Sequence, residues 1–200
     1  MRRILILFAH PALEKSRIHR RLIPAVRDLE GVTFHDLYEA YPDFAIDVAA
    51  EQARLAEHEV VVLQHPFYWY STPALLKEWQ DLVLEYGYAY GPRGNRLTGK
   101  IMFNALSAGG AAHAYQREGH NHFTVRELLA PLEQTARLCG MRYLPPFVIH
   151  GSAHLTDPAE VDQHAEDYRR ILLGLRDETF DLARTAPVPR LNADLAALGL

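Results

Sequence analysis

The segment Val60-Val61-Val62-Leu63-Gln64-His65-Pro66-Phe67-Tyr68-Trp69-Tyr70-Ser71-Thr72-Pro73 decides the fold of this chain. It begins as an apolar run rich in β-branched residues, which is typical of a strand buried on both faces of a parallel sheet. A helical pattern follows at once, and we expect Pro73 to occupy its first position, where a missing N–H is tolerated. The aromatic residues from Phe67 to Tyr70 are therefore expected on a loop at the carboxyl end of a central strand. Open α/β sheets bind ligands at such loops. The alternative is that these rings plug the end of the sheet or contact a second subunit.

Length and composition place the chain among ordinary globular proteins. Its 200 residues suit one α/β domain, and the hydrophobic content is 48% with 23% charged residues. The net charge of −4 argues against nucleic acid or an anionic membrane as the main partner. The single cysteine, Cys139, rules out an internal disulfide and indicates a reducing cytoplasm. The basic start, Met1-Arg2-Arg3, precedes an apolar run that His10-Pro11 interrupts, so we predict a first strand there and not a signal peptide.

Strand and helix patterns alternate along the chain. Besides the strand at residue 60, we predict strands over residues 4–9, 32–36, 100–107 and 142–150, the last interrupted by Pro145-Pro146. Helices are predicted over residues 16–29, 47–58, 73–84, 125–138 and 158–175. This alternation predicts a doubly wound, five-stranded parallel sheet with helices on both faces, and we expect the order 2-1-3-4-5, in which the loops after the first, third and fourth strands are neighbours. We expect residues 1–200 to form one domain, in which residues 176–200 are a C-terminal extension that ends in a short helix or a frayed tail.

Three loops meet at the switch point of such a sheet. The first runs from His10 to His19 and leads into a helix N-terminus, which is suited to bind an anion. Ser16 would then be either a phosphate ligand or only a helix cap. The second is the aromatic loop, and the third runs from Ser107 to Tyr115, where Gly109-Gly110 either allows close approach of a ligand to the backbone or only forms a turn. Together these loops predict a pocket for a flat ring with a phosphate tail, which is a flavin. The Gly- and Tyr-rich segment 86–95 either contacts this ligand or packs across an edge or a subunit boundary.

At these positions the chain resembles the flavodoxin-like NAD(P)H:quinone oxidoreductases, and among them the ancillary oxidoreductases of glutathione-gated potassium-efflux antiporters. The resemblance covers residues 3 to about 175, and its most specific runs are Ala9-His10-Pro11, Tyr41-Pro42-Asp43-Phe44, Ile46-Asp47, Glu51-Gln52, Gln64-His65-Pro66, Tyr68-Trp69-Tyr70-Ser71, Leu75-Leu76-Lys77, Ala89-Tyr90-Gly91, Gly99-Lys100 and Leu144-Pro145-Pro146-Phe147.

The resemblance implies FMN or FAD held without a covalent bond, and a homodimer with a site at each subunit junction. Carried over by position, the phosphate contacts would be His10, Ser16, Arg17 and His19, the ring contacts Phe67, Tyr68, Trp69 and Tyr70, and the contacts to the pyrimidine end Ala108, Gly109, Gly110 and Ala111. Tyr115 and His120 match a tyrosine and a histidine that support proton movement, although His120 needs a gap of one residue. The chain departs from the family at His19, where asparagine is usual, and at Ala108 and Ala111, which replace a threonine and a glycine.

The resulting hypothesis is a cytoplasmic flavin-dependent NAD(P)H:quinone oxidoreductase. It transfers hydride by a ping-pong mechanism in which the nicotinamide leaves before the quinone enters. The alternative is a regulatory subunit that binds a potassium-efflux antiporter at the inner face of the membrane. The sequence does not choose between FMN and FAD or between NADH and NADPH. The eleven histidines show no known ligand spacing, so we predict no metal site. A nicotinamide-only Rossmann domain is disfavoured because no Gly-x-Gly-x-x-Gly follows the first strand.

Overall fold

The computed structural model describes residues 1–200 and contains one parallel sheet. Its strands are β1 (Ile4–Phe8), β2 (Val32–Asp36), β3 (Val60–Pro66), β4 (Ile101–Ser107), β5 (Arg142–Tyr143) and β6 (Phe147–Ile149). The order β2-β1-β3-β4-β5 confirms the predicted flavodoxin-like arrangement. The predicted fifth strand is two short strands, β5 and β6, which both pair with β4 on either side of Pro145-Pro146. Proline lacks the N–H that a continuous strand requires there.

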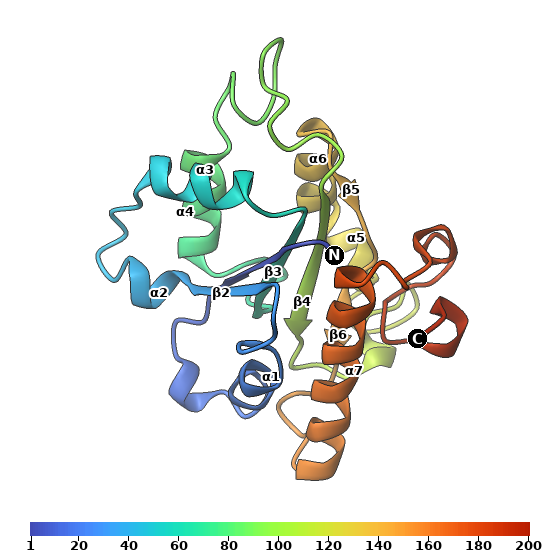
Figure 1. Cartoon of the computed structure of the whole chain (residues 1–200). Helices are drawn as coiled ribbons and strands as arrows, with labels where there is room; N and C mark the ends of the chain where they lie inside the picture. Colours follow the sequence, from blue (N-terminus) through green and yellow to red (C-terminus); the bar gives the residue numbers. More distant parts are fainter.

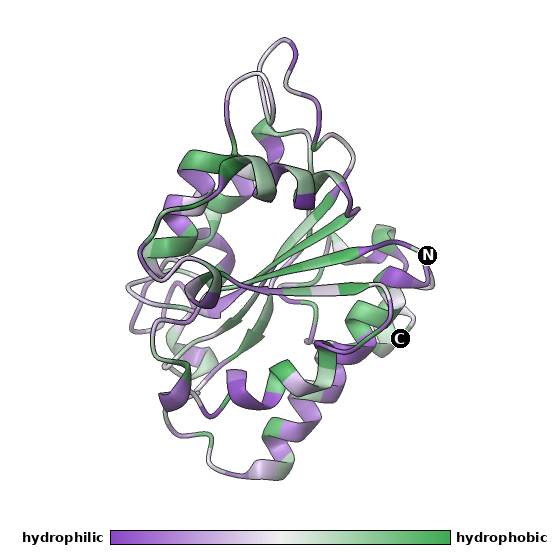
Figure 2. Cartoon of the chain, turned by 60° about the vertical axis from the view of Figure 1, so that its left-hand side comes forward, coloured by the Kyte–Doolittle hydropathy of each residue, from purple (hydrophilic) through white to green (hydrophobic).

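Alternate residues of the central strands point to opposite faces of the sheet and are covered by two layers of helices (Figure 1). Leu5, Leu7, Val61 and Leu63 pack beneath α3 (Val48–Ala56), α4 (Ala74–Val83) and α6 (Ala130–Leu138). Their neighbours Ile4, Ile6, Val60 and Val62 pack beneath α1 (His19–Val26) and α7 (Pro158–Arg176). Figure 2 shows the apolar strands between these layers. Burial on both faces explains why the strands read as continuous apolar runs.

Several helix boundaries differ from the predicted ones for local reasons. Helix α1 begins at His19 and ends at Val26, and the Ser16 hydroxyl accepts the His19 N–H (3.1 Å) from within the turn that precedes the helix. Pro73 is the N-cap of α4 and has an extended ψ of 153°. The predicted helix at 125–138 is divided at Leu129 into α5 (Val125–Leu128) and α6. Between β2 and α3, residues 37–40 form the short helix α2 (Leu37–Ala40), capped by the Asp36 carboxylate.

The C-terminal extension packs against the sheet and is not a frayed tail. It contains two short 3-10 helices, η3 (Leu182–Thr185) and η4 (Ala196–Leu198), and Leu191 and Leu198 are fully buried. The Asn192 side chain accepts the Val148 N–H (3.1 Å) and donates to the Val148 carbonyl (2.9 Å), as a neighbouring strand would. Because the extension covers the free edge of β6, we propose that residues 1–200 form one domain. No helix of the chain combines the length and apolar character needed to cross a membrane.

Candidate active site

A cavity of about 360 Å³ lies at the carboxyl edge of the sheet, where the three predicted loops meet. A fourth loop, which follows β6, also contributes. The residues that line the cavity are His10, Lys15, Ser16, Arg17 and Ile18 after β1, Pro66, Phe67 and Tyr68 at the end of β3, Ser107 and Gly109 at the end of β4, and Ser152 and Ala153 after β6. Loops separated by more than a hundred residues in sequence therefore form one site.

The loop after β1 presents donors and positive charge to this cavity. The backbone N–H groups of Arg17 and Ile18 have no acceptor within the chain. The Ser16 hydroxyl accepts the His19 N–H and keeps its own proton for a further bond. Lys15 and Arg17 add two cations to the same wall. Unpaired N–H groups, a hydroxyl and cations beside a helix N-terminus form a site for an anion such as phosphate.

A chain of buried hydrogen bonds supports the floor of the cavity. Tyr168 donates to Gln64 Oε1 (3.1 Å), and Gln64 Nε2 donates to His19 Nδ1 (3.4 Å). The His19 proton therefore sits on Nε2, which faces Ser107 Oγ at 3.1 Å. This order makes Ser107 an acceptor from His19 and leaves its hydroxyl proton free to be donated into the cavity. His19 itself is fully buried and supports the site from below.

Burial keeps the histidines of this region neutral. The pKa of His10 is lowered by burial, and that of His19 is lowered well below its ordinary value by burial and by the neighbouring His10 and His65. His10 Nδ1 accepts the Ala12 N–H (3.2 Å), so the ring proton of His10 is on Nε2. His10 lines the cavity and can donate one hydrogen bond without carrying charge.

The aromatic loop forms a tight turn with an unusual backbone. Tyr68 and Ser71 exchange backbone hydrogen bonds of 3.2 and 3.0 Å, while the two residues between them, Trp69 and Tyr70, have φ of 48° and 62°. Each such conformation costs roughly 1–2 kcal/mol for a residue with a side chain. The turn leaves Trp69 93% exposed, whereas Phe67 is buried and Tyr68 borders the cavity. A strained backbone that holds the Trp69 indole exposed to solvent indicates a binding surface.

The loop after β4 has backbone N–H groups without hydrogen-bond acceptors. The N–H groups of Gly109, Gly110 and Ala111 have no acceptor within the chain, and a Cβ added at Gly109 would meet no atom within 4 Å. Ala108 differs, since its N–H donates to the Ile149 carbonyl (2.8 Å) and its carbonyl accepts from Ser152. Ala108 therefore anchors the loop to β6, and the next three residues carry the free donors.

The structure separates the two predicted proton-handling residues. Tyr115 is half-buried, with its ring centroid 6.2 Å from that of Phe67 and 5.4 Å from that of His150. Burial, with the nearby Tyr70, raises the pKa of Tyr115, so the phenol keeps its proton at neutral pH. His120 is exposed, lines neither this cavity nor the one beyond Tyr115, and makes no hydrogen bond or ion pair. Its role stays a prediction.

Sequence reasoning missed several residues at this edge. Ser152 and Ala153 follow a strand at the same end as the other loops, so the strand-end rule could have found them. Lys15 lies inside a segment already singled out. His150 carries no local signal, because it gains its place only when β6 pairs with β4. No three His, Cys, Asp or Glu side chains are grouped so that they could hold a metal ion.

Comparison with known proteins shows the family of this chain. A family model described as having a flavodoxin-like fold matches residues 2–172. The chain is 48% identical over 149 residues to general stress protein 14 of Bacillus subtilis, covering 74% of this chain and 85% of that protein. It is 45% identical over 166 residues to the glutathione-regulated potassium-efflux system ancillary protein KefG of Shigella flexneri serotype 5b, covering 83% and 90%.

Solved structures show the same likeness. General stress protein 14 of Treponema denticola, crystallised in complex with FMN, superposes with a TM-score of 0.81 at 41% identity over 86% of this chain and 99% of that one. An NADPH-quinone reductase from P. pentosaceus superposes with a TM-score of 0.77 at 32% identity over 84% and 96%. The chain thus belongs to the flavodoxin-like NAD(P)H oxidoreductase family, together with general stress protein 14 and the potassium-efflux ancillary proteins.

Proposed function

We propose that this chain binds FMN at the carboxyl edge of the sheet and passes two electrons from NAD(P)H to a quinone by a ping-pong mechanism. The observation that carries the proposal is the meeting of unpaired backbone donors, cations and aromatic rings in one cavity. It is supported by a relative at 41% identity that was crystallised with FMN and by one at 32% identity named an NADPH-quinone reductase. FAD shares the same ring and inner phosphate, so it remains the alternative cofactor.

The residues present fit a flavin mononucleotide in their donor chemistry. The phosphate would be held by the N–H groups of Arg17 and Ile18, the hydroxyls of Ser16 and Ser107, and His10. His19 would act through Ser107 and not by direct contact. Phe67, Tyr68, Trp69 and Tyr70 would border the ring, and Gly109, Gly110 and Ala111 would donate to its polar end. The hydroxyl lost at Ala108 would cost one hydrogen bond, roughly 1 kcal/mol.

A bound flavin would hold the two electrons between the reaction with the hydride donor and the reaction with the quinone. The free N–H groups of Gly109 and Gly110 would stabilise negative charge on the reduced ring, without the reorganisation that water would need. Tyr115, protonated at neutral pH, can donate a hydrogen bond or a proton at the rim of the site. The rings of Phe67 and Tyr115 make that rim apolar, which suits a flat aromatic substrate.

The visible absorption spectrum of the purified protein tests this proposal directly. We expect flavin bands that are bleached anaerobically by NADH or NADPH and restored by benzoquinone, with parallel lines in double-reciprocal plots. Acid release and chromatography of the bound flavin then distinguish FMN from FAD. A protein that stays colourless after incubation with either flavin would refute the proposal.

A second candidate role is regulation of a potassium-efflux antiporter at the inner face of the membrane. It is favoured by the 45% identity to KefG over 90% of that ancillary protein. The exposed rings of Trp69 and Tyr86 also offer contact surfaces, either for an antiporter or for the second subunit of a homodimer. Co-purification with an antiporter from membranes, and light scattering of the isolated protein, test these two partners separately. Robust quinone turnover without an antiporter would favour the enzyme role.

A further inference from the structure

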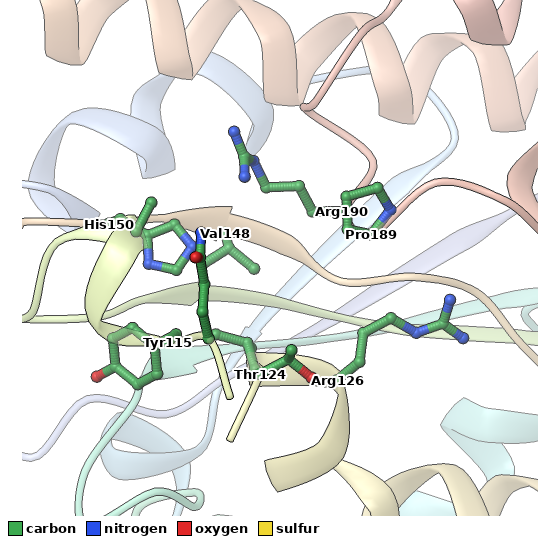
Figure 3. A pocket seen from close by; sticks show the side chains of 10 residues that line it. Tyr115, Thr124, Arg126, Val148, His150, Pro189 and Arg190 are labelled. Atoms are coloured by element: carbon green, nitrogen blue, oxygen red, sulfur yellow. The ribbon is translucent and has the colours of Figure 1, made fainter. Parts of the chain in front are cut away.

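Tyr115 also lines a second cavity, of about 350 Å³, whose side chains are shown in Figure 3. Tyr115 lines it from the loop after β4, Thr124 and Arg126 from the N-cap and first turn of α5, and Val148 and His150 from β6 and its end. Pro189 and Arg190 close it from the C-terminal extension, which lies outside the residues matched by the family model. This cavity shares no lining residue with the candidate flavin site.

The charge of this cavity is positive and uncompensated. Arg126 and Arg190 line it, none of its ten lining residues is a carboxylate, and neither arginine has an ion-pair partner. Burial and the nearby Arg190 lower the pKa of His150 to about 4, so this imidazole is neutral at pH 7 and adds no charge. Its Nδ1 atom is buried and has no hydrogen-bond partner. Buried polar atoms usually have partners, so an unpaired nitrogen near the unpaired Arg190 guanidinium, in a cavity that Arg126 also lines, points to an anionic ligand with donor or acceptor groups of its own.

The fold holds Arg190 at this position. The next residue, Leu191, is fully buried and donates its N–H to the Pro146 carbonyl (2.8 Å). Asn192 then pairs through its side chain with the backbone of Val148. On the other side, Arg126 of α5 donates to the Val188 carbonyl (3.5 Å) and so joins this helix to the extension. The two arginines therefore lie on anchored segments, and the Arg190 guanidinium makes no hydrogen bond of its own within the chain.

Tyr115 connects the two cavities. Its ring lies between Phe67, which borders the candidate flavin site, and His150, which borders the second cavity. A ligand with a flat end in the candidate flavin site and a charged end that extends past Tyr115 would reach the second cavity. NADPH has a flat end and a charged end of this kind, since its nicotinamide is joined through a diphosphate to an adenosine that bears a 2′-phosphate. Arginine is the side chain suited to such a dianionic group.

We propose that Arg126 and Arg190 bind the 2′-phosphoadenosine end of NADPH and that the C-terminal extension makes this enzyme prefer NADPH over NADH. The inference rests on the proposed function, because it assigns the reductant of the same site. Gln116 and Thr124 add polar side chains to the lining of the same cavity, and Pro189 and Val148 supply apolar walls for the adenine.

Calorimetric titration of the flavin-loaded protein with adenosine 2′,5′-bisphosphate tests this inference without turnover. Arg190→Gln is expected to weaken binding by about tenfold or more, which corresponds to about 1.4 kcal/mol. Arg190→Lys keeps the charge and should lose less affinity. The matched control is Arg184→Gln, because Arg184 lies in the same extension, is exposed and is paired with Asp181. Its affinity should equal that of the unaltered protein.

Steady-state kinetics give an independent readout. Arg190→Gln should raise the KM for NADPH by about tenfold while leaving kcat and the KM for NADH unchanged. Equal affinity of the unaltered and Arg190→Gln proteins for the bisphosphate would overturn the inference, as would binding of inorganic phosphate as tight as that of the nucleotide. Absence of quinone turnover with intact, Arg190-dependent calorimetry would instead overturn the proposed reaction and leave the nucleotide site standing.

Discussion

Glu51 is the buried carboxylate on which the helices of one sheet face depend. Its side chain is fully buried and accepts hydrogen bonds from Trp79 Nε1 (2.8 Å), the Tyr41 hydroxyl (2.8 Å) and His35 Nε2 (2.9 Å). Arg54 lies at 3.5 Å. These donors come from β2, α3, α4 and the segment after α2. We predict that Glu51→Gln destabilises the fold, because a neutral amide cannot accept from all these donors and its own NH₂ group would face them.

The size of the effect follows from the pKa of this carboxylate. Burial alone would raise it, but the hydrogen bonds from His35, Trp79 and Tyr41 prevail and hold the pKa of Glu51 at about 2, against 4.5 for an ordinary glutamate. At about 1.36 kcal/mol for each unit of pKa, the charged form contributes about 3 kcal/mol of stability. Because the pKa of the folded protein is the lower one, this contribution is complete above pH 4.5 and is lost as the pH falls toward 2.

Urea unfolding at two pH values measures this contribution. At about pH 7 the unfolding free energy of Glu51→Gln should be lower than that of the unaltered protein by about 3 kcal/mol, and at about pH 3 the gap should shrink by more than half. Glu57→Gln is the control, since Glu57 is exposed and its pairing with Arg3 is a surface contact with little effect on stability. A gap that is the same at both pH values would show that the loss comes from packing and not from the charge.

Three further predictions concern the site. Tyr115→Phe should lower kcat by about a hundredfold with flavin content unchanged, as the absorption spectrum and anaerobic reduction kinetics would show; unaltered rates would remove Tyr115 from the mechanism. The unaltered protein should lose stability as the pH falls from about 6.5 to 5, because His19 becomes protonated in the unfolded chain but stays neutral when buried, at up to about 1.4 kcal/mol for each pH unit. His19→Asn should make this loss smaller. Urea unfolding across this range measures the loss, and an identical pH profile for the variant would contradict the assignment. Trp69→Gly should leave the fold at least as stable, since it relieves a positive φ at an exposed position, but should weaken flavin binding or dimerisation; unchanged flavin affinity by fluorescence together with unchanged mass by light scattering would contradict a binding role.

The sheet could be predicted from the sequence because its signals are local. The β-branched run at residue 60 and the alternation of strand and helix patterns indicate a doubly wound parallel sheet, and the order 2-1-3-4-5 is one that brings the three conspicuous loops together. The helix after β1 begins at His19 and not at Ser16, and a turn that the Ser16 hydroxyl bonds to the His19 N–H precedes it. The positive φ values of Trp69 and Tyr70 could not be foreseen, since residues with large side chains rarely adopt them.

The second cavity shows the limit of reading motifs along the chain. Arg190 is one arginine among many in the sequence, and nothing near it resembles a binding motif. Its place beside His150 depends on Leu191 and Asn192, which attach the extension to the edge of β6. This attachment forms only when β6 has folded as an edge strand, so the sequence around Arg190 does not predict it.

The strained turn at Trp69 and Tyr70 is connected to the buried Glu51 carboxylate through helix α4. A turn with positive φ at both Trp69 and Tyr70 persists only if both of its ends are held. One end is held by the bond from the Phe67 N–H to the Ser107 carbonyl (2.8 Å). The other end leads through Pro73 into α4, whose Trp79 is bonded to Glu51. Loosening α4 at Glu51 should therefore let the turn relax, so the same substitution that lowers stability should also lower flavin affinity, although Glu51 does not line the cavity.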